Sequence, residues 1–190
     1  MGFTGQGRWD RALLGSDLAL LVMVSIDKFI IPRMLSFESL ALYFAIISIF
    51  KIFDIILQAA NFVLLPYIKK LRKHQLLRAA FVILLSGTLI FIAYIVLGPW
   101  LVDIAFKGKY NAGVYLIPIL GFARVFQFFY VLPESFLTIR ADKLNSLFAL
   151  NMLTIVISII LTIYLTMKYG LAGAATSLAI VWFIRFAGAS

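Results

Sequence analysis

Residues 79–97 read AAFVILLSGTLIFIAYIVL, a run of mostly apolar side chains without a single charge. An α-helix rises about 1.5 Å per residue, so a run of this length is suited to the hydrocarbon core of a bilayer, which is about 30 Å thick. The whole chain shares this character, since 64% of its 190 residues are hydrophobic and 13% are charged. Soluble domains contain about 45 to 50% apolar and about 25% charged residues. The composition therefore excludes a soluble or disordered protein and predicts membrane helices.

Five more apolar stretches lie on either side of this one. We expect an all-α membrane protein, a bundle of six transmembrane helices, preceded by a short tail at residues 1–12. The predicted helices occupy residues 13–34, 40–67, 79–97, 112–139, 147–167 and 171–187. The segment 98–111, GPWLVDIAFKGKYN, is too polar to span and too apolar for a free loop. We expect it at the outer membrane interface, with Trp100 and Tyr110 as anchors.

The loop charges predict the orientation of the bundle. Most Lys and Arg residues outside the helices fall in the N-terminal tail, in the loops 68–78 and 140–146, and at Arg185 near the C-terminus. Because basic loops stay on the cytoplasmic side, both termini are predicted to be cytoplasmic. The net charge of +9 has the same origin, so no nucleic-acid partner is expected.

Several kinds of catalytic and metal site are excluded by composition. The chain has no cysteine, and its one histidine, His74, stands in a basic run. Disulfides, thiolate metal sites and cysteine nucleophiles are therefore absent, and histidine-based triads or paired-histidine metal sites are not expected. We predict that the protein is not an enzyme and that it uses no cofactor or metal.

Charged residues at membrane depth are the candidates for function, because a Lys, Arg or Asp at a helix centre costs about 2.5 to 3.5 kcal/mol on insertion scales. Such groups face a bundle interior or a water-filled cavity. Three of the predicted helices, 13–34, 40–67 and 112–139, carry nearly all of them. These charges are Asp17, Asp27, Lys28, Lys51, Asp54, Arg124 and Glu134.

Two of these helices gather their polar side chains on one face, at the steps of three and four residues that define such a face. The face of helix 40–67 consists of Lys51, Asp54, Gln58 and Asn61. The face of helix 112–139 consists of Arg124, Gln127, Glu134 and Thr138, with Tyr130 beside them. We interpret the two faces as the lining of a hydrated cavity. The alternative is internal neutralisation, in which Lys51 and Asp54 form a buried pair that only packs the bundle.

Other polar and small residues favour packing roles. Helix 147–167 has a row of side chains suited to hydrogen bonds between membrane helices, namely Asn151, Thr154, Ser158 and Thr162. The segment 170–177, GLAGAATS, predicts a close helix contact. Pro118 and Pro133 predict a bend in helix 112–139.

Four motifs occur in order along the chain. They are SIDKFIIPRMLSFESLALYFAII at 25–47, NFVLLPYIKKL at 61–71, FKGKYNAGVYLIPIL at 106–120 and KYGLAGAATS at 168–177. In this order they resemble the C-terminal lobe of the bacterial polysaccharide flippases in the multidrug/oligosaccharidyl-lipid/polysaccharide exporter superfamily. Asp27, Lys28, Leu42 and Tyr43 match the opening of that lobe, although Ala41 stands where the family more often has glycine.

The resemblance implies a transporter of the bacterial cytoplasmic membrane. Such a protein moves a polyprenyl-pyrophosphate-linked oligosaccharide to the outer leaflet by alternating access, with its cavity between two six-helix lobes. The chain corresponds to one lobe, so the resemblance implies a fragment, a split subunit or a half-transporter that forms a homodimer. Two lobes of six helices are parallel repeats, which a twofold axis along the membrane normal can relate.

The intramembrane charges then have expected roles. Arg124, Lys51 and Lys28 are expected to attract the pyrophosphate, Arg124 above all because a guanidinium binds phosphate oxygens in a fork. Asp27, Asp54 and Glu134 are expected to balance these cations or to take up coupling ions. Polar cavity contacts are expected from Gln58, Asn61, Gln127 and Tyr130. Two alternatives stay open, an exporter of drugs or other small molecules in the same superfamily and a membrane scaffold for polysaccharide assembly.

Overall fold

The computed structural model describes residues 18, 21, 22, 25–51, 55, 73–139 and 144–189. Within these ranges the chain forms helices and turns and no strand. The elements are α2 (Phe37–Ile49), α4 (Lys73–Phe106), the 3-10 helix η1 (Asn111–Leu116), α5 (Ile117–Ile139) and α6 (Leu144–Ala189). Three stretches, Ala80–Phe106, Asn111–Val131 and Phe148–Gly188, are long and apolar enough to cross a membrane. These findings confirm the all-helical class and support a membrane protein.

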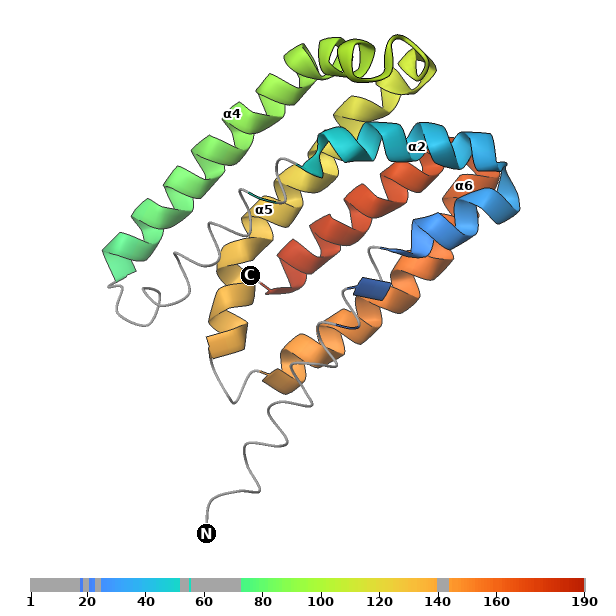
Figure 1. Cartoon of the computed structure of the whole chain (residues 1–190). Coiled ribbons are helices and arrows are strands. Elements are labelled where there is room, and N and C mark those ends of the chain that lie inside the picture. The colour runs from blue at the N-terminus through green and yellow to red at the C-terminus, as the bar shows by residue number, and fades with distance from the viewer. Residues whose placement is uncertain are drawn as a thin grey trace.

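The long helices lie side by side, and α2 crosses them at an angle (Figure 1). α5 packs against both α4 and α6, while α2 packs on η1 and α4. Residues 25–34 form a further helical segment before α2. Apart from residues 18, 21 and 22, the rest of the predicted helix 13–34 lies outside the described residues, as does nearly all of 50–67.

α6 is a hairpin of two helical arms. At Gly170 the backbone turns non-helical, with φ 60° and ψ −137°, a conformation that only glycine adopts readily. The first arm is 144–169 and the second is 171–189, which correspond to the predicted helices 147–167 and 171–187. A Cβ on Gly173 would overlap the carbonyl of Leu165, so the arms meet backbone to backbone. This contact confirms the close packing predicted for 170–177.

α4 does not end at Leu97 as predicted. The helix continues through Pro99 to Phe106, and only then does the chain turn at Lys107 and Gly108, which have φ of 50° and 79°. The prediction ended the helix at Leu97 because the segment 98–111 is more polar than the apolar run before it. Pro99 does not stop the helix, since a proline removes only one helical hydrogen bond. The residues beyond it still pack inward, since Val102 is completely buried. Much of the segment 98–111 is therefore the last part of a long helix.

The boundaries of the neighbouring helices follow local capping chemistry. α2 begins at Phe37 because the Ser36 hydroxyl accepts a hydrogen bond of 3.0 Å from the Ser39 N–H. The predicted helix 112–139 comprises η1 followed by α5. Pro118 lies in the first turn of α5, where a missing N–H costs little, whereas Pro133 lies inside the helix.

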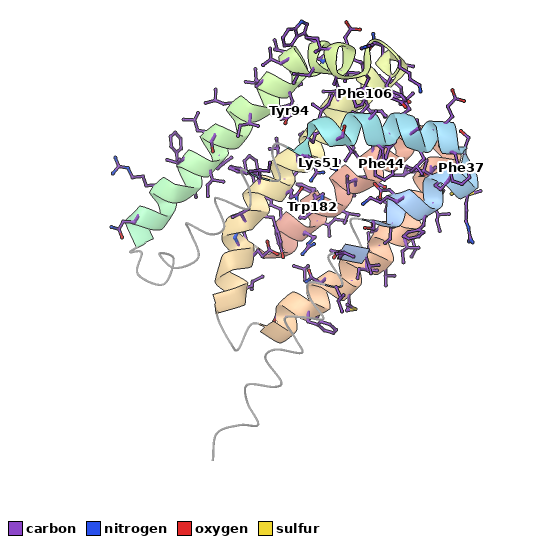
Figure 2. The ribbon with its side chains drawn as sticks, viewed as in Figure 1. Phe37, Phe44, Lys51, Tyr94, Phe106 and Trp182 are labelled. Atoms are coloured by element: carbon purple, nitrogen blue, oxygen red, sulfur yellow. The ribbon has the colours of Figure 1, made fainter. Side chains whose placement is uncertain are left out.

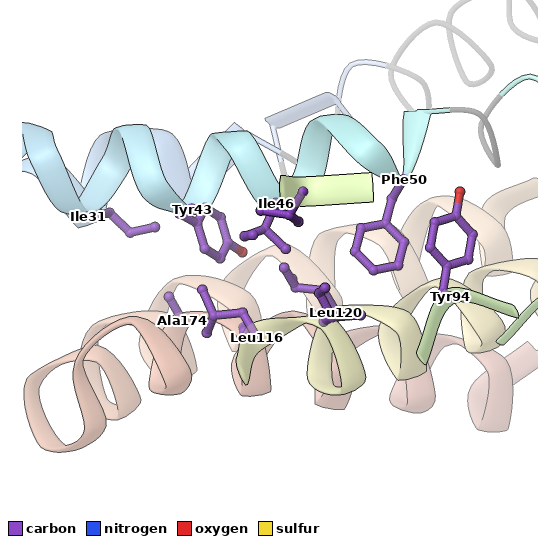
Figure 3. Close-up of a cluster of buried hydrophobic side chains, with 11 residues drawn as sticks. Ile31, Tyr43, Ile46, Phe50, Tyr94, Leu116, Leu120 and Ala174 are labelled. Carbon is purple, nitrogen blue, oxygen red and sulfur yellow. The ribbon is translucent and has the colours of Figure 1, made fainter. Parts of the chain in front are cut away.

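A buried hydrophobic cluster holds α2 against the bundle (Figure 3). Its members come from α2, α4, η1, α5 and the second arm of α6, and include Tyr43, Ile46, Leu116, Leu120 and Ala174. At one end the rings of Phe50 and Tyr94 stack with centroids 4.6 Å apart. The Tyr94 hydroxyl also donates a hydrogen bond of 3.1 Å to the carbonyl of Ile49. This packing sets the position of Tyr43 relative to α5.

Candidate functional site

Arg124 lies on the inward face of α5 and is only 9% exposed. Its Nη1 donates a hydrogen bond of 2.7 Å to Oε1 of Gln127, one helical turn further along. This hydrogen bond shows that the two residues share one face of the helix, as the sequence predicts. Arg124 therefore brings the positive charge of a guanidinium into an apolar bundle.

Asp27 is a second buried charged residue. It is 6% exposed, and its Oδ1 accepts a hydrogen bond of 2.8 Å from the backbone N–H of Lys28. Asp27 and Arg124 come from different helical segments, so two of these segments each bury a charged side chain.

Tyr43 of α2 is a third buried polar residue, and its side chain is fully buried in the core (Figure 3). Among the described residues its hydroxyl has no hydrogen-bond partner. Three helical segments thus each bury a polar side chain, namely Asp27, Tyr43 and Arg124. The sequence pointed to Tyr43 only as part of a motif, because nothing in its spacing shows that it is buried.

The other two predicted cavity cations lie differently. Lys28 is half-buried, with its Nζ 5.6 Å from the centre of the Phe44 ring, a cation–π contact. Lys51 lies exposed just beyond the end of α2 (Figure 2). The polar residues predicted to share a face with Lys51 lie outside the described residues; they are Asp54, Gln58 and Asn61.

Arg185 forms a second polar centre that the sequence analysis missed. We had assigned it to the cytoplasmic C-terminal end, yet its side chain is completely buried. Its Nη2 donates hydrogen bonds to Oδ1 of Asn151 at 2.6 Å and to the Tyr130 hydroxyl at 3.3 Å. The guanidinium carbon lies 4.6 Å from the Tyr130 ring centre and 5.1 Å from that of Trp182. We call these four residues the Arg185 cage; Trp182 marks its place between the helices (Figure 2).

The Arg185 cage ties α5 to both arms of α6. Tyr130 comes from α5, Asn151 from the first arm, and Trp182 and Arg185 from the second. Glu134 is half-buried one turn after Tyr130. Tyr130, predicted beside the polar face of helix 112–139, thus contacts Arg185. The sequence offered one indication that Arg185 contacts Trp182, because the two residues lie three positions apart and therefore share a helix face.

The polar row on the first arm of α6 serves packing. Asn151, Thr154, Ser158 and Thr162 are all buried, as is Thr166 one turn later. The hydroxyls of Thr162 and Ser177 lie 2.8 Å apart and join the two arms by a hydrogen bond. Thr154 instead donates to the carbonyls of Leu150 and Asn151 on its own arm. The predicted hydrogen bond between helices is confirmed at Thr162.

An apolar groove of about 580 Å³ lies between α5 and the second arm of α6. Its walls include three aromatic side chains, those of Phe122, Phe126 and Phe183. None of the predicted site residues lines it, so this groove is not the hydrated cavity predicted from the polar faces. In the described part of the chain, no group of three or more His, Cys, Asp or Glu side chains is placed to bind a metal ion.

Comparison of the chain with protein-family models, with curated proteins and with solved structures finds no match. The functional argument therefore depends on the chemistry of the buried charges. A guanidinium and an amide side by side form a donor-rich site, which suits an anion with several oxygens.

Proposed function

We propose that the protein is one lobe of a flippase that moves a polyprenyl-pyrophosphate-linked oligosaccharide across the bacterial cytoplasmic membrane. The proposal includes six transmembrane helices, cytoplasmic termini and alternating access to a cavity completed by a second six-helix lobe, either a partner or a second copy. The resemblance of the four motifs motivates it.

The observation that carries the proposal is Arg124, a buried cation in a helix apolar enough to span the membrane. A permanent charge at membrane depth is costly, and such residues mark substrate or ion pathways. The fork of a guanidinium matches phosphate oxygens, and the neighbouring Gln127 amide supplies a further donor once it turns toward the ligand. An organic-cation exporter would instead require a net negative site, whereas Arg124 is itself a buried cation.

The test is a flipping assay on the purified chain in proteoliposomes. It measures how much labelled polyprenyl-pyrophosphate oligosaccharide becomes accessible in the outer leaflet. Arg124→Gln should abolish protein-dependent flipping, whereas the same change at the exposed Arg33 should leave it intact. Both variants should insert into the membrane and elute as the parent does. Full flux in Arg124→Gln would remove Arg124 from the mechanism, and absence of flux from well-folded parent protein would favour the scaffold role or a distinct second lobe.

A further inference from the structure

The apolar groove between α5 and the second arm of α6 lies halfway along both helices. Phe122 and Ile180 both line the groove. Phe122 lies within one residue of the midpoint of the span Asn111–Val131, and Ile180 lies at the midpoint of the second arm, 171–189. Because a membrane-spanning helix is centred on the bilayer, the groove straddles the bilayer midplane.

The walls of the groove suit a hydrocarbon ligand. The rings of Phe122 and Phe183 are each about half exposed, and both meet the ring of Phe126 edge to face, with centroids 4.7 and 5.1 Å apart. Ala179, only 7% exposed, forms the floor. Among the described lining side chains the one polar group is the hydroxyl of Thr176, which donates a hydrogen bond of 2.7 Å to a carbonyl of its own helix. The volume of about 580 Å³ falls within the range of about 300 to 1,000 Å³ that is usual for ligand pockets.

The depth of the groove determines which hydrocarbon chain fits it. The hydrocarbon core is about 30 Å thick, so the acyl chains of each phospholipid leaflet end near the midplane. On α5 the lining residues extend from Pro118 to Phe126, a distance of about 12 Å along the helix. A ligand that fills the groove therefore has a chain that continues across the midplane. A polyprenyl chain does so, because its length is not limited to one leaflet.

We infer that this groove holds the polyprenyl chain of the transported lipid while Arg124 binds its diphosphate. The inference rests on the proposed function and adds a chain site to its headgroup site. α5 supplies both sites. Phe122 and Phe126 lie one turn apart on the groove side, and Arg124 lies two residues from each of them, on the opposite side of the helix, since two steps along an α-helix turn by about 200°. A polyprenyl chain is long enough to pass around a helix that is about 10 to 12 Å in diameter.

Three ligands separate the chain site from the headgroup site. The purified chain in detergent is titrated with a polyprenyl alcohol, the matching polyprenyl diphosphate and inorganic pyrophosphate. Ile180→Trp fills the groove, so both polyprenyl ligands should bind at least about tenfold more weakly, whereas binding of pyrophosphate should not change. The matched control is Ile160→Trp, the same change at a 61% exposed position of the first arm that does not line the groove. It should leave all three affinities unchanged.

A second variant keeps the inference testable if Ile180→Trp does not fold. Phe183→Ala removes a half-exposed wall of the groove and should weaken binding of both polyprenyl ligands by about fivefold. Its control is Phe81→Ala, which removes an exposed ring from α4 and should change no affinity. Unchanged binding of the polyprenyl alcohol in either folded groove variant would overturn the inference.

Arg124→Gln separates this inference from the proposed function. It should weaken binding of both diphosphate ligands and leave binding of the alcohol unchanged. If it weakens neither, the headgroup site of the proposed function fails, while loss of alcohol binding in Ile180→Trp still supports the chain site. If Arg124→Gln loses the diphosphates but the groove variants keep the alcohol, only the chain site is refuted.

Two further measurements address other occupants of the groove. A phospholipid that displaces the polyprenyl alcohol from the parent protein at equal concentration would show that the groove accepts any acyl chain. A change in the oligomeric mass of Ile180→Trp in micelles would show that the groove contacts a second copy of the chain. Either result would overturn the inference, whereas selective binding of the polyprenyl alcohol at unchanged mass supports it.

Discussion

Removal of the Arg185 guanidinium tests the second polar centre. In Arg185→Ala, Asn151 and Tyr130 lose their charged partner, and the rings of Tyr130 and Trp182 lose a cation that lies within about 5 Å of each ring centre. We expect the free energy of unfolding to fall by about 3.5 kcal/mol. The 2.6 Å bond to Asn151 accounts for about 1.5 kcal/mol of this loss, and each ring contributes about 1 kcal/mol.

Arg185→Lys separates charge from shape in the same cage. Lysine keeps the positive charge but lacks the planar fork that contacts Asn151 and both rings together. We expect it to recover less than half of the lost stability. If Arg185→Lys recovered all of the lost stability, the positive charge alone would account for the contribution of Arg185.

The assay is reversible unfolding of the purified protein in mixed micelles, followed by tryptophan fluorescence, which reports on Trp182 beside the guanidinium. The control is Arg33→Ala, because Arg33 is exposed and its loss should change stability by less than about 0.5 kcal/mol. The double variant Arg185→Ala, Asn151→Ala should cost clearly less than the two single effects added together. If Arg185→Ala were no more destabilising than Arg33→Ala, the reasoning about the cage would be refuted.

Two further changes test the hairpin of α6. Gly173→Ala places a methyl group against the Leu165 carbonyl, so the arms must separate; we expect a loss of at least about 2 kcal/mol in the same unfolding assay, and parent-like stability would contradict the close contact. Thr162→Val removes the hydrogen bond to Ser177 at nearly constant volume and should cost about 1 kcal/mol. The same change at Thr88, which is exposed and bonds only within its own helix, should cost nothing measurable, and equal effects at both positions would argue against the bond between the arms.

The end of α4 and the position of Arg185 were predicted wrongly for different reasons. The end of α4 was misplaced because polar residues in 98–111 interrupt the apolar run, while the inward packing of Val102 depends on distant residues. Arg185 was misassigned for another reason. Its neighbours in sequence lie at the end of an apolar run, which is where a loop cation is expected, and its partners Tyr130 and Asn151 come from other helices.

The sequence by itself determined the helical membrane class, the division between helices 147–167 and 171–187, and the sharing of one helix face by Arg124 and Gln127. Each of these follows from local quantities, namely the lengths of the apolar runs and the helical repeat. Only the tertiary structure decided that Asp27, Tyr43 and Arg124 are all buried, and that Arg185 is enclosed between α5 and the two arms of α6. The helical repeat specifies the direction in which a side chain points, but the packing of one helix against another decides which partner it finds there.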